Sequence, residues 1–278
     1  MRQYLQFGRF GFNLPGPGSA LVMGILNVTP DSFSDGGQFQ ALEFALARAE
    51  DMVLAGVDII DIGGESSRPG APALSLVEEL QRVMPVLYAL RDCGKPLSVD
   101  TYKPEVMREA ILAGADMIND INAFRAPGAI AAVRDSDCAL CIMHMRGAPQ
   151  TMQEQPRYDD VVAEVIDFLA ARVAELTAAG IERERLCIDP GYGFGKTAEH
   201  NFALLKASGR IRDALGLPML AGLSRKSMLG AVTGRPVEQR LAGSIAGALA
   251  ALAHGAEIIR VHDVAETVDA LMVWRAAH

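Results

Sequence analysis

The chain lacks the features that mark several common classes of protein. It has no apolar run long enough to span a membrane, and its first residues, MRQYLQFGRFGFNLPGPG, lack the apolar segment of a signal peptide. Lys and Arg number 26 against 34 Asp and Glu, so the net charge is −8 and no basic stripe is available for nucleic acid. We therefore expect a cytoplasmic protein whose partners include neither a membrane nor a nucleic acid.

Cysteine is also scarce. The four cysteines, Cys93, Cys138, Cys141 and Cys187, show no spacing typical of a disulfide framework. Cys138 and Cys141 form a CxxC pair, but they lie in a predicted strand, where residues three apart point to opposite faces. One metal ion could not bind both, and the chain has no second such pair. We interpret the cysteines as structural thiols.

Strand and helix patterns alternate from residue 19 to the end of the chain. The predicted strands are short and almost entirely apolar, as expected when both faces of a parallel sheet are covered; they span 20–26, 57–62, 97–99, 116–119, 139–143, 186–188, 219–222 and 258–261. Helices are predicted over 40–55, 75–92, 104–113, 127–135, 158–178, 199–215, 238–253 and 264–275. The helix starts include two predicted capping boxes, Ser75 with Glu78 and Asp263 with Glu266, and first-turn prolines at Pro104 and Pro236.

Eight such units predict an α/β protein with the (β/α)₈ TIM-barrel fold. A doubly wound sheet is the alternative that this pattern leaves open. No linker or low-complexity stretch divides the 278 residues, so we expect one domain over 1–278, with an N-terminal β-hairpin in 1–18 and the barrel in 19–278.

The most informative stretch runs from Met23 to Gly37, with the sequence MGILNVTPDSFSDGG. An apolar strand ends on Asn27 and opens into a polar, glycine-rich loop that still holds a large ring, Phe33. A strand that stops on an amide and leads into such a loop is typical of a binding site rather than of a simple connection.

Polar groups recur at the ends of the other predicted strands. In a (β/α)₈ barrel these ends meet at one rim, where active sites lie. The residues concerned are Asn27, the run from Asp61 to Arg68, Asp100, Asn119, His144, Asp189, the run from Ser224 to Lys226, Arg260 and His262. Buried charges are costly unless they are paired, so this accumulation indicates a ligand site.

The rim divides into two chemistries. A donor group suited to a phosphate or diphosphate contains Arg68, Arg260, His262 and Lys226, with Asn27 as an oxygen ligand for Mg²⁺. Asp100, Asn119 and Asp189 suit a flat nitrogen heterocycle with amino and amide edges. We therefore expect a heterocycle deep in the barrel and an anion nearer its mouth.

The segment DPGYGFGKT, 189–197, is similar to a phosphate-binding Walker loop, but Pro190 stands where that pattern requires Gly. Its glycines instead favour close approach of the backbone to a ligand, with Phe194 beside it. Met143 suits a pocket wall. For His144 a structural role is favoured, although a functional one stays open.

Together these residues resemble the dihydropteroate synthase family of folate biosynthesis, the target of sulfonamides. The resemblance covers nearly the whole chain after the hairpin, in the family's order: NVTPDSFSDGG (27–37), DIGGESSRPGA (61–71), SVDT (98–101), INDI (118–121), DPGYGFGK (189–196), GLSRKSMLG (222–230) and RVHDV (260–264). It implies a (β/α)₈ barrel, usually a homodimer, that joins p-aminobenzoate to 6-hydroxymethyl-7,8-dihydropterin diphosphate and releases pyrophosphate with Mg²⁺ present.

The resemblance also implies roles for individual residues. The pterin site would contain Asp100, Asn119, Ile121, Met143, Asp189, Phe194, Lys226 and Arg260. The diphosphate site would contain Asn27, Arg68, Arg260 and His262, with Asn27 as the Mg²⁺ contact. The p-aminobenzoate site would contain Phe33, Ser67, Pro69, Ser224 and Lys226, with Ser67 where many members have Thr. The catalytic group would be Asp100, Lys226, Arg260 and His262.

The implied reaction is diphosphate departure assisted by Mg²⁺, followed by attack of the arylamine on the pterin methylene cation. Two alternatives stay open: a catalytically silent pterin-binding paralogue and a pterin-dependent methyltransferase. Dimerisation is expected through late helices such as 238–253, whose small apolar face is formed by Leu241, Ala242, Ile245, Ala246 and Leu249.

Overall fold

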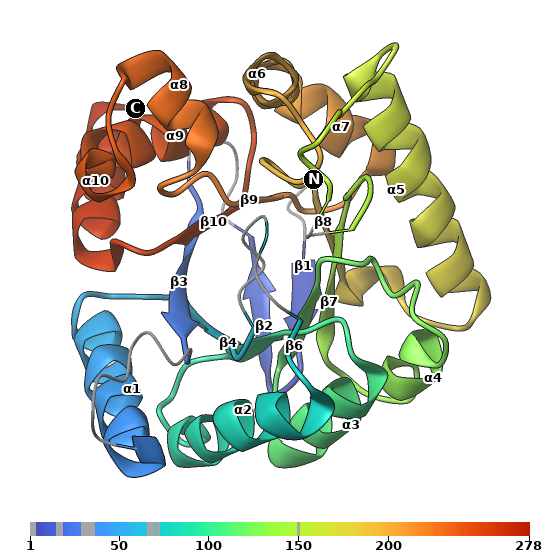
Figure 1. Cartoon of the computed structure of the whole chain (residues 1–278), viewed down its shortest axis with the longest axis vertical. Helices are drawn as coiled ribbons and strands as arrows, with labels where there is room; N and C mark the ends of the chain where they lie inside the picture. The colour runs from blue at the N-terminus through green and yellow to red at the C-terminus, as the bar shows by residue number, and fades with distance from the viewer. Residues whose placement is uncertain (1–3, 15–18, 29–36, 66–69, 71–72, 149–150) are drawn as a thin grey trace.

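The protein is a parallel barrel surrounded by helices (Figure 1). The computed structural model describes residues 4–14, 19–28, 37–65, 70, 73–148 and 151–278. Eight strands follow the sheet order β8-β7-β6-β5-β4-β3-β10-β9, and neighbouring strands are parallel. Their bounds are β3 Leu21–Asn27, β4 Ile59–Gly63, β5 Leu97–Asp100, β6 Met117–Asp120, β7 Ala139–Met143, β8 Leu186–Asp189, β9 Leu220–Ala221 and β10 Ile258–Val261.

The two ends of the sheet meet between β8 and β9. Ile188 forms an isolated parallel bridge with Met219, and the Ile188 N–H donates to the Pro218 carbonyl at 2.9 Å. This contact brings the sheet round into a nearly closed barrel. The predicted (β/α)₈ fold is therefore confirmed, and the doubly wound alternative is wrong.

Helices cover the outside of the barrel (Figure 1). Their bounds are α1 Gly37–Leu54, α2 Leu76–Leu90, α3 Pro104–Ala113, α4 Ala129–Val133, α5 Val161–Ala178, α6 Ala198–Lys206, α7 Ser208–Leu215, α8 Ser227–Thr233, α9 Leu241–Ala253 and α10 Val264–Ala277, with short 3₁₀ turns at Arg183–Arg185 and Val237–Gln239. No helix within the described ranges is both long and apolar enough to cross a membrane.

The helix ends correct three details of the sequence prediction. The Ser75–Glu78 capping box is present, but the Asp263 side chain does not cap α10, because its carboxylate pairs with Arg225 instead. The single helix predicted over 199–215 is two helices, since the chain leaves helical geometry at Ala207. Pro236 precedes the 3₁₀ turn Val237–Gln239 rather than opening the helix that follows.

The predicted N-terminal hairpin is present as β1 Tyr4–Phe7 and β2 Phe10–Asn13, and it packs on the barrel interior. Leu5 and Phe7 are fully buried in one cluster with inward-facing strand residues such as Met23 and Met117. The hairpin thus contributes apolar side chains to the interior, and Phe7 meets Phe12 edge to face at 5.3 Å.

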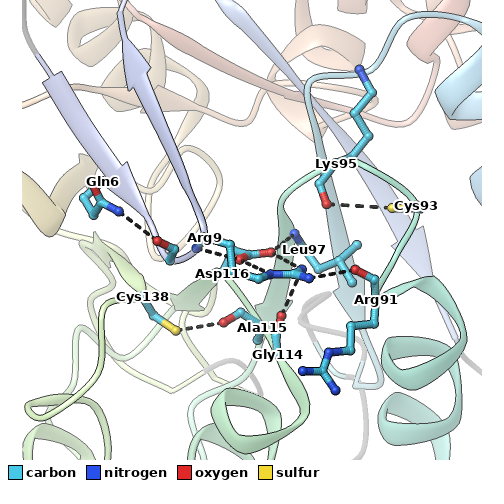
Figure 2. A network of polar contacts seen from close by, with 11 residues as sticks. Gln6, Arg9, Arg91, Cys93, Lys95, Leu97, Gly114, Ala115, Asp116 and Cys138 are labelled. Atoms are coloured by element: carbon cyan, nitrogen blue, oxygen red, sulfur yellow. Dashed lines mark hydrogen bonds and ion pairs between the residues drawn. The ribbon is translucent and has the colours of Figure 1, made fainter.

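Arg9, in the turn of the hairpin, fixes this unit to the strands (Figure 2). Its Nε and Nη2 donate to the buried Asp116 carboxylate at 3.0 and 2.9 Å. Asp116 also accepts from the Leu97 N–H at 3.0 Å, so one carboxylate joins the hairpin to β5.

The two cysteines of the CxxC pair, Cys138 and Cys141, lie in different environments. The Cys138 thiol donates to the Ala115 carbonyl at 2.9 Å, just before β7. Cys141 lies in the barrel interior, where the strand register pairs it with Cys187 of β8.

Candidate active site

Polar residues at the carboxyl ends of neighbouring strands form one layer of the barrel interior. The register pairs Gly63 of β4 with Asp100 of β5, and Asp100 with Asn119 of β6. On the other side, Met143 of β7 pairs with Asp189 of β8. Because parallel strands point their carboxyl ends to the same side, the fold brings together residues that are far apart in sequence.

Arg260 of β10 joins the deepest polar groups of this layer. Its Nε donates to Asp61 Oδ2 at 2.6 Å, and its Nη2 donates to Asp100 Oδ2 at 2.8 Å. Asn119 Nδ2 donates to the same Asp61 oxygen at 3.3 Å. The Asp61 side chain is 0% exposed, and its Oδ1 has no hydrogen-bond partner among the described residues.

Burial and mutual pairing shift the ionisation of these groups. Burial raises the pKa of Asp100, an effect that Arg260 opposes and the Asp61 carboxylate reinforces. Burial also opposes the charge on Arg260, but the Asp61 and Asp100 carboxylates outweigh it and raise the pKa of Arg260. One guanidinium is shared by two carboxyl groups, and the raised pKa of Asp100 reduces the negative charge that this pair carries near neutral pH.

Lys226 and Asp189 line the opposite part of the site. The Asp189 carboxylate accepts from the Gly191 N–H at 2.7 Å, and burial raises the pKa of Asp189. The Lys226 ammonium donates to the Tyr192 carbonyl and lies 4.7 Å from the centre of the Phe194 ring. Burial lowers the pKa of Lys226 to about 8, partly offset by Asp189.

Gly222 brings Lys226 and Arg260 into the same neighbourhood. A Cβ built on Gly222 would lie 3.9 Å from Lys226 Nζ and 3.8 Å from Arg260 Cβ. The space beside Gly222 is therefore bordered by both cationic side chains, one from β10 and one from the start of α8.

An apolar wall completes the inner site. Three residues predicted to line a heterocycle pocket, Ile121, Met143 and Phe194, belong to one hydrophobic cluster. Met145, Met152 and Tyr102 join the same cluster, and no pattern in the sequence indicated their part in it. Methionine side chains are flexible and polarisable, which suits contact with the face of a planar ring.

Ser224, His262 and Asn27 lie at other strand ends of the rim. The Ser224 oxygen is 3.1 Å from His262 Nδ1 and accepts from the His262 N–H at 3.2 Å. Asn27 is the last residue of β3. A Cβ built on Gly63 would lie 3.7 Å from Asn27 Oδ1 and 3.8 Å from Asp100 Cβ. Gly63 therefore keeps space open between the Asn27 amide and the Asp100 layer.

Four predicted site residues, Phe33, Ser67, Arg68 and Pro69, lie outside the described residues. The chain leading to the second of these segments is described as far as Glu65. Tyr102 donates to the Glu65 carboxylate at 2.8 Å, and the Lys103 ammonium pairs with both Glu65 and the buried Glu79. This network fixes the start of the segment that carries Ser67 and Arg68.

The surroundings of His144 are those of a core side chain, which agrees with the structural role favoured from the sequence, and its functional role stays a prediction. It is buried, it meets the Phe168 ring edge to face at 4.9 Å, and its Nδ1 is 2.9 Å from Lys196 Nζ. Burial lowers the pKa of His144 to about 3, so the ring is neutral at physiological pH.

The site offers hydrogen-bonding groups on one side and apolar atoms on the other. Carboxylates at Asp100 and Asp189 and the amide of Asn119 can meet the N–H and carbonyl edges of a flat heterocycle. The cations Arg260 and Lys226 suit a neighbouring anion. Asp61, which accepts from both Arg260 and Asn119, was predicted only as part of the rim and without a role of its own. Its position at a strand end did not indicate these contacts.

Asn27 is the residue that fits a magnesium ion. Its amide oxygen is a hard donor beside the open space at Gly63. Within the described residues no three His, Cys, Asp or Glu side chains are placed to hold a metal ion. Mg²⁺ commonly binds through one or two protein oxygens together with substrate phosphates and water, so a single amide ligand is compatible with it.

Comparison with known proteins places the chain among pterin-binding proteins. The family described as pterin binding enzyme matches residues 23–262. The dihydropteroate synthase of Haemophilus influenzae is 53% identical over 258 residues, which cover 92% of this chain and 93% of that protein.

Solved structures agree with this relationship. The crystal structure of Burkholderia cenocepacia dihydropteroate synthase complexed with 7,8-dihydropteroate has a TM-score of 0.90 at 55% identity, covering 99% of this chain and 96% of that one. The Xanthomonas albilineans enzyme with 4-aminobenzoic acid has a TM-score of 0.88 at 53% identity, covering 93% of each chain.

Proposed function

This chain belongs to the dihydropteroate synthase family of pterin-binding enzymes, and we propose that it transfers the (7,8-dihydropterin-6-yl)methyl unit from diphosphate to the amino group of p-aminobenzoate. The substrate would be 6-hydroxymethyl-7,8-dihydropterin diphosphate, and the products 7,8-dihydropteroate and pyrophosphate. The observation that carries the proposal is a buried polar network together with an apolar wall. The network joins Asp61, Arg260 and Asp100, and the wall contains Ile121, Met143 and Phe194. This combination suits a planar ring with polar edges.

The proposed pterin subsite is the inner layer. Asp100, Asn119 and Asp189 would meet the edge of the ring, and Lys226 would donate to its carbonyl or ring nitrogen. Arg260, held in place by two carboxylates, would lie against the ring face, as Arg commonly does on planar groups. Ile121, Met143 and Phe194 would form the apolar wall.

The proposed diphosphate subsite lies nearer the mouth. Arg68, Arg260 and His262 would bind the phosphate oxygens, and Asn27 would hold Mg²⁺. Charge neutralisation on the diphosphate is the chemistry that Mg²⁺ supplies when bound. The cationic side chains would stabilise the negative charge that develops on the departing oxygen.

The deep carboxylates would favour the other half of the same bond cleavage. As the carbon–oxygen bond breaks, positive charge develops on the pterin methylene group and spreads into the ring. Asp61 and Asp100 both pair with Arg260, and their carboxylate oxygens would stabilise such a cation. The arylamine of p-aminobenzoate is uncharged at neutral pH and could attack without a strong general base.

The proposed p-aminobenzoate subsite combines Ser224 and Lys226 with the segments that carry Phe33, Ser67 and Pro69. Support from the described residues is limited to the rim: Ser224 lies against His262, and Lys226 opens α8. The ordered start of the second segment at Glu65 gives that segment a fixed point of departure from the barrel.

The decisive experiment is pyrophosphate release from the purified protein. We expect release only when dihydropterin diphosphate, p-aminobenzoate and Mg²⁺ are all present. Tight pterin binding without release would favour the silent paralogue, and methyl transfer from a methylated pterin would favour the methyltransferase. Release without p-aminobenzoate would contradict the proposed second substrate.

A homodimer formed through α9 also belongs to the proposal. The face predicted for it points away from the barrel, because Leu241, Ala242 and Ala246 are exposed while Ser244 and Ala248 are buried. We expect Leu241→Glu to shift the protein from dimer to monomer in sedimentation velocity, with Arg134→Glu as a surface control. A wild-type monomer at micromolar concentration would contradict the dimer.

The single-domain organisation and the cytoplasmic location stay predictions.

A further inference from the structure

Lys196 is a buried lysine to which the proposed reaction assigns no task. Its residue is 3% exposed, and its ammonium lies within hydrogen-bond distance of three different residues. It donates to the Gly191 carbonyl at 2.9 Å and to the Phe194 carbonyl at 3.1 Å, and His144 Nδ1 accepts from it at 2.9 Å. A fourth acceptor, the His144 carbonyl, lies farther away at 3.4 Å, so the three N–H donors of the ammonium group all have acceptors.

These contacts close the segment 190–196 on itself. The ammonium of its last residue binds carbonyls near its beginning and its middle, so the segment is folded around a single buried charge. The segment also lies directly on the chain that follows β7. A Cβ on Gly191 would approach the His144 carbonyl oxygen to 1.9 Å, and one on Gly195 would approach the Arg146 carbonyl oxygen to 2.3 Å.

The same segment, 190–196, also contacts Lys226. The Lys226 ammonium donates to the Tyr192 carbonyl and lies 4.7 Å from the centre of the Phe194 ring. The stem of Lys226 passes close to Gly193, where a Cβ would lie 3.3 Å from Lys226 Cδ. Two lysines thus bind carbonyls of one segment: Lys196, which is its last residue, and Lys226, which belongs to the proposed site.

We propose that Lys196 is a positioning residue, which fixes the 190–196 segment and through it sets Lys226 and Phe194 for the pterin ring. This inference rests on the proposed function of the site. Lys196 would not touch the substrate, and its effect would pass through the Tyr192 carbonyl and the Phe194 ring, which both belong to the segment that it closes.

The cost of burying an ammonium group argues for a specific role. A buried charge is favourable only where its hydrogen bonds are well made, and an apolar side chain often gives equal or greater stability. Burial lowers the pKa of Lys196 to about 7. An apolar substitute would fill the space but would leave the Gly191 and Phe194 carbonyls without this donor, and the segment could then relax away from Lys226.

The test compares Lys196→Met with Lys206→Met, an exposed lysine on the neighbouring α6. Calorimetry with 6-hydroxymethyl-7,8-dihydropterin diphosphate should show roughly a ten- to hundredfold weaker affinity for Lys196→Met, in the range for a lost charged hydrogen bond, and no change for Lys206→Met. Wild-type protein that does not bind this ligand would refute the proposed function. Wild-type protein that binds it with the same affinity as folded Lys196→Met would refute only the positioning role.

A double-mutant cycle separates positioning from general stabilisation. If Lys196 acts through the segment, the losses in affinity of Lys196→Met and Phe194→Ala should combine to less than their product, because both changes disturb the same contact with Lys226. Losses that multiply would overturn the proposal. If Lys196→Met does not fold, Lys196→Gln, which keeps two N–H donors, replaces it in both measurements and is judged by the same outcomes.

Discussion

Asp61 orders the deepest part of the site through a single carboxylate oxygen. That oxygen accepts from Arg260 at 2.6 Å and from Asn119 at 3.3 Å, so it fixes two predicted pterin ligands at once. Arg260 is in turn bound to Asp100. Rigid placement of this kind lowers the entropic cost of binding a planar ligand.

We expect Asp61→Asn to weaken pterin binding by roughly ten- to hundredfold, the range for loss of a charged hydrogen bond. The amide can still accept from Arg260, but it brings an N–H that competes with Asn119 and it removes the negative charge. Calorimetry with the pterin substrate measures the effect, and Asp135→Asn, with a side chain that is 77% exposed, is the control. Equal affinities for the two variants would show that Asp61 does not order the site.

The ionisation of Lys226 predicts how pterin binding depends on pH. Its pKa is lowered to about 8, so the ammonium donor is present below that pH and is lost as the pH rises through it. Pterin affinity should therefore fall above about pH 8. Calorimetry across this range measures the fall, and it should be absent in Lys226→Met; an unchanged profile in that variant would assign the titration to another group.

The sequence predicted most residues of the inner site but not their contacts. Asp100, Asn119 and Asp189 were predicted because each ends an apolar strand, and parallel topology then brings such ends together. The role of Asp61 depends on its pairing with Arg260, which is 199 residues away in sequence, and no local pattern encodes such a contact. The roles of Phe33 and Arg68 stay predictions, since both lie outside the described residues.

Among the elements, the segment between β8 and α6 is constrained by close backbone contacts. Gly191 and Gly195 each have a positive φ, and each lies close to a carbonyl oxygen of the segment that follows β7. From the sequence, these glycines were predicted to allow close approach of the backbone to a ligand. In the structure the close approach is to the backbone of residues 144 and 146, and the segment presents Phe194 and the Tyr192 carbonyl to Lys226.

Gly191→Ala should be much more destabilising than Gly180→Ala. Both glycines have a positive φ, which costs an alanine about 1–2 kcal/mol, but only at Gly191 would the new Cβ meet an atom, the His144 oxygen at 1.9 Å. Urea denaturation of the two variants measures the difference. Equal free energies of unfolding would mean that the contact with His144 adds nothing to the backbone strain.

Element prediction succeeded where turn residues bounded an apolar run and failed where no such boundary was visible. The strands 139–143 and 258–261 were predicted with their exact bounds, because continuous apolar runs between turn residues are distinctive. Helix α8 has only seven residues, too few for a helical period to be recognised, and it was missed. The break at Ala207 was also missed, because the apolar positions on both sides continue one pattern.

At the scale of the whole molecule, Asp116 joins parts of the chain that are distant in sequence. It accepts from the Arg9 side chain across 107 residues and from the Leu97 main chain at the start of β5 (Figure 2). The hairpin therefore attaches to the barrel by an ion pair as well as by the apolar contacts of Leu5 and Phe7.

Removal of this ion pair should destabilise the protein. Arg9→Ala leaves a buried carboxylate with fewer donors, and we expect a loss of about 1–3 kcal/mol in the free energy of unfolding. Arg134→Ala, which breaks a pair of exposed side chains with Asp135, should cost less than about 0.5 kcal/mol. Urea denaturation of both variants measures the difference, and a loss at Arg9 no larger than at Arg134 would show that the Arg9 side chain does not help to hold the hairpin.

The pairing of β3 with β10 has a consequence for protein synthesis. The first strand of the barrel has its partner at Ile258–Val261, close to the end of the chain. A nascent chain therefore exposes β3 as an open sheet edge until β10, the last strand of the barrel in chain order, has been made, and such edges invite association with other chains. Arg260 arrives on that same last strand. The growing chain thus closes its barrel and acquires the central cation of its site in one late event.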